Sequence, residues 1–368
     1  MRRLVLLGGG HAHVEVLRDL ALNPDPARRV TLVTPSHRLL YSGMVPGVIA
    51  GHYASADCAI DLAALAQRAN AELLLTTAAL VSPDANDVTC SDGTALRYDV
   101  LSIDVGSQPA IGGAEGVERH AVLMRPLERA LIGWSGVLAR AREGGIRAVT
   151  VVGGGAAGIE LALAMRQRFN LDCAAATVPH VRVIAEAAGV GIATGAARKL
   201  RRCMRKAGVE SHVGMAVKEV GRGYVRLDGG LEFATDVVFW ATGAAAHDWI
   251  RDSGFATDKR GFLLTNLRMQ SVRYANVFAA GDCATIEGNE LPKAGVFAVR
   301  AAPLLAANLR AALAGGELAA IEPKPRYLAL ISTGRRHAVG TWGRFSWQGR
   351  WVWRWKDRID RRFVARYS

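Results

Sequence analysis

The stretch Leu4-Val5-Leu6-Leu7-Gly8-Gly9-Gly10-His11-Ala12-His13 decides the fold, because a short apolar run stops at three glycines and a helical pattern begins. A continuous apolar run of this kind is typical of a buried parallel strand. Glycines between a strand and a helix let an anion approach free amide groups and the positive end of the helix dipole. The stretch therefore predicts a dinucleotide-binding turn, with Gly8, Gly10, His11 and Ala12 at the diphosphate.

The same arrangement returns in Val149-Thr150-Val151-Val152-Gly153-Gly154-Gly155-Ala156-Ala157-Gly158. This second turn has all three glycines of the G-x-G-x-x-G pattern, at Gly153, Gly155 and Gly158. In the first turn, His13 stands at the third position, where close packing of helix on strand usually requires glycine. Two such turns in matching contexts predict two nucleotide cofactors in one chain.

The segments around the two turns repeat one plan. The first half has a strand at 4–7, a helix at 11–22 and a strand at 29–33, and the second half has a helix at 157–169 and a strand at 181–185. Further predicted segments are a helix at 61–70, strands at 73–81, 87–90 and 95–105, a structured loop at 41–53 and a basic helix at 198–206. Each half ends with an apolar strand, at 99–106 and at 236–243. Gly106 and Gly243 are the last residues of these strands and are further candidates for cofactor contacts. The prediction is an α/β fold with two Rossmann-like three-layer domains, antiparallel insertions and a small C-terminal domain.

Three positions near strand ends are candidates for cofactor contacts. Thr34 stands where an acidic residue often binds a ribose, so Arg38 is a candidate to assist. Glu186 favours NADH over NADPH if it binds the ribose 2′-hydroxyl, and a solvated surface glutamate is the alternative. Asp282 ends a third strand at the edge where such sheets bind ligands, with a simple turn residue as the alternative. A helix from about Ala294 aims its positive end at an anion, such as a reduced flavin.

Composition limits the chemistry. The five cysteines, at positions 58, 90, 173, 203 and 283, form no C-x-x-C pair and no metal-ligand spacing, so redox chemistry requires a cofactor and no metal site is predicted. No apolar run reaches the roughly 18 residues of a spanning helix, which predicts a cytoplasmic protein. The net charge of +13 indicates an acidic partner, or only a basic surface.

The tail from Arg335 to Ser368 is basic and holds five of the eight tryptophans. One apolar stripe at i, i+4 spacing is formed by Trp351, Trp355, Ile359, Phe363 and Tyr367, with arginines on both sides. This pattern is typical of a helix at a membrane interface, here the inner face of the plasma membrane. A helix packed on its own protein, or on a second subunit of a homodimer, is the alternative.

Together these segments resemble the FAD-dependent pyridine nucleotide-disulfide oxidoreductases related to type II NADH dehydrogenases and sulfide:quinone oxidoreductases. Within that family, the chain is most similar to the flavoprotein module fused to some selenide, water dikinases. The resemblance is carried by residues 8–14, 41–53, 101–107, 153–160, 280–284, 292–300, 328–333 and 353–363.

The resemblance implies a discontinuous FAD-binding domain (1–115 and 245–325), an NAD(P)H-binding domain (116–244) and a C-terminal segment (326–368). It implies that the first turn binds the FAD diphosphate and the second turn NAD(P)H. It also implies that Asp282 holds the ribityl chain and that Lys293, Ala294 and Gly295 lie beside the isoalloxazine. Lys293 is the charged residue expected to affect catalysis, with a surface lysine as the alternative. Cys283 follows Asp282 and is expected to be packed and inert rather than to approach the flavin.

The expected function is transfer of a hydride from NAD(P)H to FAD and of electrons to a second acceptor, a quinone at the membrane surface. Dithiol substrates are disfavoured because the paired cysteines are absent. Two other functions stay open. One is a reductase of selenium or sulfur species that works with a partner enzyme. The other is a flavin- and NAD(H)-binding interaction module, with nucleic acid as its less favoured partner.

Overall fold

The first half is built on a five-stranded parallel sheet in the order β21-β9-β1-β2-β5. The computed structural model describes residues 1–187, 189 and 191–368. The strands are β1 (Arg2–Leu7), β2 (Arg28–Val33), β5 (Ala71–Leu74), β9 (Val100–Ile103) and β21 (Val277–Ala279). Leu4, Leu6 and Leu7 are fully buried, as expected for a strand covered on both faces.

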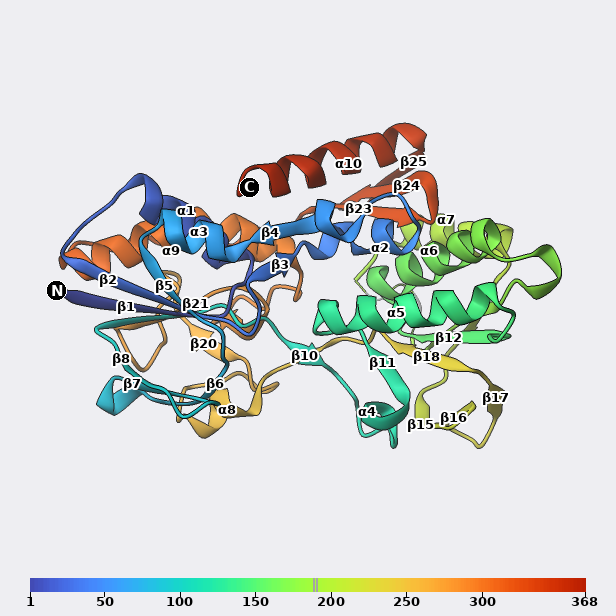
Figure 1. The fold of residues 1–368 in the computed structure, drawn as a ribbon, viewed down its shortest axis with the longest axis horizontal. Helices are drawn as coiled ribbons and strands as arrows, with labels where there is room; N and C mark the ends of the chain where they lie inside the picture. Colours follow the sequence, from blue (N-terminus) through green and yellow to red (C-terminus); the bar gives the residue numbers. More distant parts are fainter. Residues whose placement is uncertain (188, 190) are drawn as a thin grey trace.

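Helices cover one face of this sheet and an antiparallel insertion lies on the other side (Figure 1). The helices are α1 (His11–Leu22), α3 (Leu62–Arg68) and α9 (Gly295–Ala314), and the insertion is formed by β6 (Ala78–Ser82), β7 (Asp87–Cys90) and β8 (Ala95–Arg97). The single strands predicted at 73–81 and 95–105 are wrong. Each is split between the parallel sheet and the insertion, because the chain leaves the sheet after β5 and returns to it at β9.

The second half repeats this plan with the strand order β11-β18-β12-β13-β14. Its strands are β11 (Ala121–Leu123), β12 (Ala148–Val152), β13 (His180–Ala185), β14 (Val209–Val213) and β18 (Val237–Trp240). Its helices are α4 (Val117–His120), α5 (Leu127–Arg142), α6 (Ala156–Asp172) and α7 (Thr194–Ala207), and its insertion is β15 (Val217–Gly221), β16 (Tyr224–Leu227) and β17 (Glu232–Ala234). The chain passes between the halves through an antiparallel pair, β10 (Gln108–Pro109) and β19 (Ala244–Ala245). The predicted fold class is confirmed.

The remaining short elements complete the first half. They are β3 (Arg38–Leu40), β4 (Ala59–Asp61), α2 (Val45–Ile49), α8 (Asp248–Asp252), β20 (Leu263–Thr265) and β22 (Ala284–Ile286). The loop predicted at 41–53 is wrong in part, because a 3-10 helix (Ser42–Met44) and α2 lie within it. Pro46 falls in the first turn of α2, where the missing N–H costs no helical hydrogen bond.

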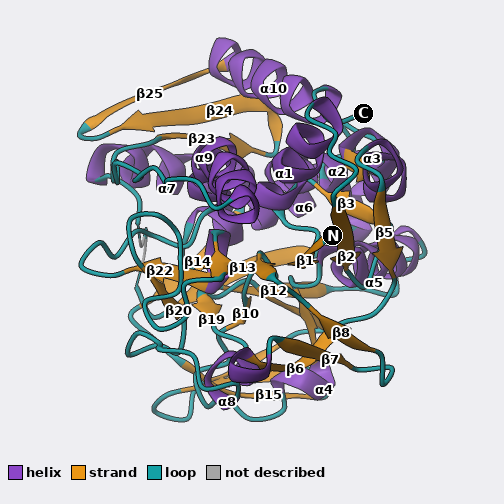
Figure 2. Ribbon diagram, turned by 90° about the vertical axis from the view of Figure 1, so that its left-hand side faces the viewer, coloured by secondary structure: helices purple, strands orange, loops and turns teal. Residues whose placement is uncertain are grey.

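The C-terminal segment joins the two halves. A three-stranded sheet, β23 (Leu328–Thr333), β24 (Arg335–Trp342) and β25 (Phe345–Gly349), packs on α6. The helix α10 (Arg350–Ala365) continues from it toward the first half (Figures 1 and 2). Val352, Val364 and Tyr367 are buried in this arrangement. Much of the tail is therefore part of the protein's core.

One helix in the described part of the chain, α9, is long and apolar enough to cross a membrane by length and composition. The expectation that no segment reaches this length is therefore wrong. Ala302, Leu305 and Leu309 of this helix are buried, and α9 packs against α1. These contacts are those of a core helix.

Candidate functional site

The first glycine turn lies between β1 and α1 and is packed tightly against the end of β9. Gly8 has φ +93°, which favours glycine, and a Cβ there would collide with the main-chain oxygen of Asp104. A Cβ at Gly10 would collide with the Asp104 carboxylate. Glycine is therefore required at both predicted positions by the end of β9.

His13 fills the place of the missing third glycine with a fully buried ring. Its Nδ1 lies 2.6 Å from the main-chain oxygen of Gly8, and its Nε2 lies 2.8 Å from Oγ of Ser102. Burial lowers the pKa of His13 to about 4, so the ring is neutral near pH 7. His13 thus links the turn to β9 by hydrogen bonds, where glycine would allow direct packing.

The second turn lies between β12 and α6 and has the same backbone plan. Gly153 N–H donates to Ile184 O at 2.9 Å, just as Gly8 N–H donates to Val33 O at 2.8 Å. A Cβ at Gly158 would collide with the main-chain oxygen of Gly153. The third glycine is therefore a steric requirement in this half.

A charged cluster lies beside the first turn. Asp282, in the 3-10 helix Gly281–Cys283, accepts a hydrogen bond from Arg125 at 3.1 Å. Burial lowers the pKa of His11 by more than the nearby carboxylates of Asp104 and Asp282 raise it, so this pKa lies below its usual value. The Nε2 atom of His11 is buried and has no hydrogen-bond partner among the described residues. Arg125 belongs to the second half, so this cluster bridges the two halves.

Lys293 lies just before α9 and is held by the protein. Its Nζ donates to the main-chain oxygen of Ala284 and, at 2.9 Å, to Oγ1 of Thr285, and it lies 3.9 Å from the centre of the Phe262 ring. Burial lowers the pKa of Lys293. Lys293 is therefore not the surface lysine of the alternative interpretation, and its effect on a flavin stays a prediction.

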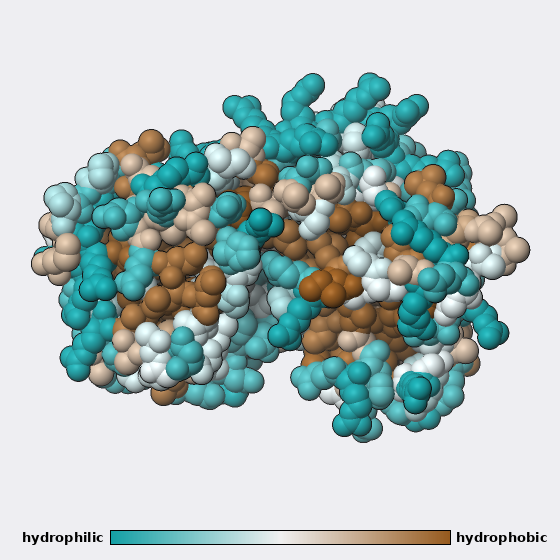
Figure 3. Space-filling model, in the orientation of Figure 1, coloured by the Kyte–Doolittle hydropathy of each residue, from teal (hydrophilic) through white to brown (hydrophobic). Residues whose placement is uncertain are grey.

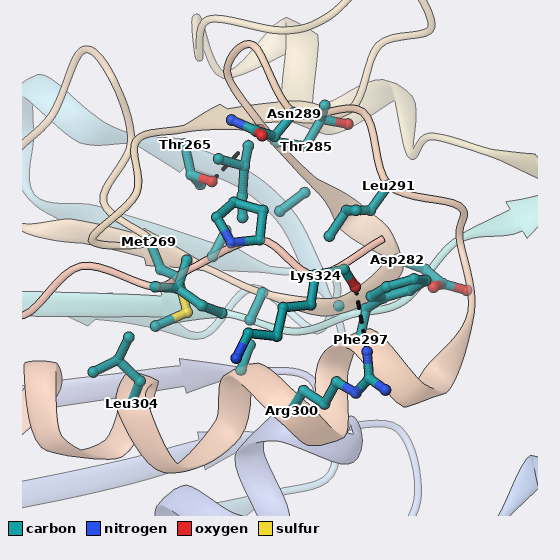
Figure 4. A pocket seen from close by; sticks show the side chains of 18 of the residues that line it. Thr265, Met269, Asp282, Thr285, Asn289, Leu291, Phe297, Arg300, Leu304 and Lys324 are labelled. Carbon is teal, nitrogen blue, oxygen red and sulfur yellow. Dashed lines mark hydrogen bonds between the residues drawn. The ribbon is translucent and has the colours of Figure 1, made fainter. Parts of the chain in front are cut away.

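A cavity of about 530 Å³ opens beside Asp282 and Lys293. Apolar side chains line much of it, among them Met269, Leu291, Phe297 and Leu304. Arg300 and Lys324 lie close together beside α9 in Figure 4, and Arg300 donates to the main-chain oxygen of Lys324 at 3.3 Å. The cavity combines apolar walls with charged groups of both signs, because Asp282 and Glu322 line it as well as Arg300 and Lys324. Lys324 pairs with Glu322 at 3.1 Å.

The remaining predicted positions are spread over both halves. Gly106 (φ +71°) and Gly243 follow β9 and β18, and Ala294 and Gly295 form the start of α9. Glu186 is exposed just after β13, and Arg38 is exposed at the start of β3. Cys283 is fully buried and its Sγ contacts Ala280 O at 3.1 Å, with a pKa raised to about 12 by burial. A packed, inert cysteine is thus the better description.

The first turn fits a dinucleotide diphosphate. In the described residues, the amides of Gly9, Gly10 and His11 have no protein acceptor, and Nε2 of His11 is unpartnered nearby. Such unsatisfied donors at a helix start are the groups that bind phosphate. The second turn offers the amides of 154–158 in the same way.

Sequence reasoning missed Asp104, Arg125 and Glu160. For Asp104 a signal exists, since aligning the strand 99–106 with 236–243 places Asp104 opposite Ala241. Arg125 and Glu160 gain their partners only through tertiary contacts, so no local pattern marks them.

A family model described as "Pyridine nucleotide-disulphide oxidoreductase" matches residues 2–302. A probable NADH dehydrogenase of Dictyostelium discoideum is 24% identical over 373 residues, which cover 92% of this chain and 80% of that protein. The solved sulfide:quinone oxidoreductase of Aquifex aeolicus superposes with a TM-score of 0.83 at 20% identity, covering 100% of this chain and 91% of that one. The structure of NDH2 from Plasmodium falciparum in complex with NADH superposes with a TM-score of 0.83 at 14% identity, covering 99% and 97%.

The two solved structures share the fold of this chain, and the family match covers both glycine turns and Asp282. The predictions of an oxidoreductase with FAD and NAD(P)H as cofactors are confirmed by these findings. The narrower resemblance to the module fused to selenide, water dikinases stays a prediction. The chain belongs to the pyridine nucleotide-disulphide oxidoreductase family.

Proposed function

We propose that this protein oxidises NAD(P)H through FAD and reduces a quinone-like acceptor at a membrane surface. FAD is assigned to the first turn, in the domain 1–115 with 245–325, and NAD(P)H to the second turn, in the domain 116–244. When bound, FAD supplies the capacity to take up a hydride and to release the electrons to an acceptor. The C-terminal segment 326–368 forms the membrane-facing part.

The observation that carries this proposal is the repetition of one cofactor-binding plan in two linked halves. Each turn sits at the carboxyl ends of its parallel sheet, where such sheets bind ligands. The halves are fastened to each other by β10 with β19 and by the Arg125–Asp282 pair. This linkage holds two nucleotides in a fixed relation, as hydride transfer between two rings requires.

The cavity beside Asp282 is the proposed place for the acceptor. It borders Lys293 and the start of α9, where the resemblance puts the isoalloxazine. The start of α9 directs its dipole toward this region, and Arg300 adds positive charge that stabilises a reduced, anionic quinone. The charge of Lys324 is offset by its ion pair with Glu322.

An apolar patch on the C-terminal segment supports attachment to a membrane surface. The exposed fractions of its large side chains are 44% for Trp342, 61% for Phe345, 55% for Trp351, 37% for Trp355 and 40% for Ile359. We call these five residues the exposed aromatic patch. Hydrophilic side chains project from this edge of the molecule in Figure 3, where α10 runs. Tryptophans with flanking arginines are typical of proteins that bind a membrane interface. Coverage of the patch by a second copy is the alternative outcome.

An anaerobic stopped-flow experiment tests the function. The full-length flavoprotein is mixed with NADH or NADPH while flavin absorbance is followed, and the reduced protein is then mixed with a short-chain quinone. Rapid bleaching followed by rapid reoxidation supports the proposal. Failure of both nucleotides to bleach the flavin contradicts hydride transfer. Bleaching without reoxidation by the quinone contradicts only the acceptor, and sodium dithionite provides the fully reduced reference.

A further inference from the structure

Asp104 occupies part of the anion-binding end of α1. Its Oδ2 accepts hydrogen bonds from the amide of Ala12 at 2.7 Å and from the amide of His13 at 3.2 Å. The residue is 3% exposed and follows β9 directly. A carboxylate therefore already satisfies two amides of this helix start, whereas the amides of Gly9, Gly10 and His11 have no acceptor among the described residues and can bind a diphosphate.

The second half provides an internal comparison. The strands 99–106 and 236–243 align without a gap, and Ala241 takes the place of Asp104. The amides of Ala157 and Gly158, which correspond to those of Ala12 and His13, have no protein acceptor among the described residues. The same scaffold thus leaves these two amides free in the second half and gives them to a carboxylate in the first.

The residues packed around Asp104 leave space for its side chain. A Cβ at Gly10 or at Gly281 would collide with the Asp104 carboxylate, and Gly281 has φ +73°. These two glycines lie on separate elements, at the start of α1 and in the 3-10 helix Gly281–Cys283. Both leave room for one acidic side chain.

The groups that face Asp104 come from several elements. Two of them are on α1: His11, which favours the charged form of Asp104, and His13, which is neutral. The 3-10 helix contributes Asp282, whose negative charge disfavours the charged form of Asp104, and the buried Cys283. Arg125 lies behind Asp282 and pairs with it. Burial outweighs the two amide hydrogen bonds and raises the pKa of Asp104 to about 6.

We propose that Asp104 couples FAD binding to the uptake of one proton, by carrying that proton when the diphosphate is bound. The proposal rests on the assignment of FAD to the first turn. As a carboxylate, Asp104 places a negative charge beside the diphosphate in a site that excludes water, where repulsion is strong. As a carboxylic acid it removes that charge and gains an O–H group that donates to a phosphate oxygen. The proton comes from solvent on binding and returns to solvent on release.

Linkage gives the sign and size of the effect. Well below pH 6 Asp104 already holds its proton in the free protein, so its titration makes no contribution to the pH dependence of FAD affinity there. At higher pH, binding must take up a proton, and the affinity falls by up to about tenfold per pH unit until Asp104 also ionises in the complex. The affinity of the second site for NADH lacks this dependence, because Ala241 cannot titrate.

The test measures FAD retention by the full-length protein from about pH 6 to about pH 8.5. Protein is dialysed to equilibrium against graded FAD, and free flavin is measured by its fluorescence. Wild type is expected to lose roughly tenfold in affinity per pH unit over part of this range. Asp104→Asn, which keeps the shape and the acceptor oxygen, is expected to bind FAD with no such slope. Asp104→Ala, which copies the second half, is expected to lose the slope as well. Two independent substitutions separate the charge effect from a local folding defect.

A second readout identifies the protonated group. The infrared spectrum of the wild-type holoprotein is expected to show the C=O band of a buried carboxylic acid, absent from Asp104→Asn. A wild-type affinity that does not change with pH, or a slope that persists in Asp104→Asn, overturns the proposal. Glu118→Gln, which removes an exposed carboxylate on α4, is the control and should keep the slope. Failure of the chain to retain FAD at any pH instead contradicts the assignment of FAD itself.

Discussion

Glu15 and Glu160 occupy equivalent positions in the two halves, each seven residues after the first glycine of its turn, and the C-terminal segment contacts both. Glu15 accepts hydrogen bonds from Tyr367 Oη at 2.8 Å and from Arg366 at 2.7 Å. Glu160 accepts from the amide of Ser332 at 2.6 Å and lies near Lys356. The C-terminal segment thus holds the two cofactor-binding helices, α1 and α6, at corresponding places.

Tyr367→Phe tests this attachment at its α1 end. The change removes one hydroxyl and leaves the ring, so the buried Glu15 carboxylate loses a donor. We expect the free energy of unfolding to fall by about 1–3 kcal/mol, measured by urea denaturation with an unchanged slope. Tyr327→Phe is the matched control, since in the described residues its hydroxyl makes no hydrogen bond and only its ring contacts Phe297. Equal losses in the two variants would argue against the contact with Glu15.

Glu160→Gln tests the other end through pH. Burial raises the pKa of Glu160 from 4.5 to about 7, although Lys356 and the Ser332 amide lower it. Between these values the folded protein holds one more proton than the unfolded chain, so Glu160 makes stability fall as pH rises from 4.5 to 7. Glutamine cannot titrate, and its oxygen still accepts from Ser332.

We therefore expect Glu160→Gln to match wild type near pH 4.5 and to exceed it at pH 8 by about 1–3 kcal/mol. Urea titrations at the two pH values measure this difference. The exposed Glu118, on α4, provides Glu118→Gln as the control, which should show no pH-dependent gain. A variant that is less stable than wild type at pH 8 would mean that the Lys356 contact outweighs burial.

The parts of the fold that could be predicted are those encoded in local patterns. Both glycine turns and the central parallel strands follow from apolar runs bounded by glycine. The break between β5 and β6 was missed, because the apolar pattern runs on while the chain changes sheets. Asp104 was missed because its role depends on two amides some 90 residues earlier in the chain.

The tail shows the same limit of periodicity. A stripe at i, i+4 spacing predicts one apolar face but not what covers it. Tyr367 is only 3% exposed, and its hydroxyl donates a hydrogen bond to Glu15 of α1. Trp351, at the other end of the stripe, is 55% exposed. The predicted stripe is therefore buried at its C-terminal end and open at its N-terminal end.

The exposed aromatic patch predicts how the protein meets a lipid surface. The triple variant Trp351→Ser, Trp355→Ser, Ile359→Ser removes exposed apolar area and keeps the buried residues of α10, which are Val352, Asp360 and Val364. Because Trp355 also stacks on Trp347, urea denaturation checks that the variant folds like wild type. We expect roughly tenfold or greater loss of binding to anionic vesicles, measured by sedimentation, with soluble-dye reduction by NADH unchanged. The variant Ile132→Ser, Leu171→Ser removes exposed apolar side chains elsewhere and should bind like wild type. Unchanged vesicle binding in the triple variant, with altered oligomeric mass, would assign the patch to a second copy of the chain.

Gly158→Ala separates the two cofactor sites. An added Cβ would collide with the main-chain oxygen of Gly153, which moves α6 away from the turn that we assign to NAD(P)H. Overpacking of this kind costs about 1–3 kcal/mol, which corresponds to roughly ten- to hundredfold weaker NADH binding if the strain falls on the site. FAD should remain bound and should still be bleached by dithionite, because the first turn is untouched. Gly136→Ala is the control, since a Cβ on α5 at that position meets no atom of the described residues within 4 Å. Stopped-flow reduction of the flavin at several NADH concentrations measures the change. If the variant were reduced at the wild-type rate and with the wild-type affinity for NADH, the assignment of NADH to the second turn would be contradicted.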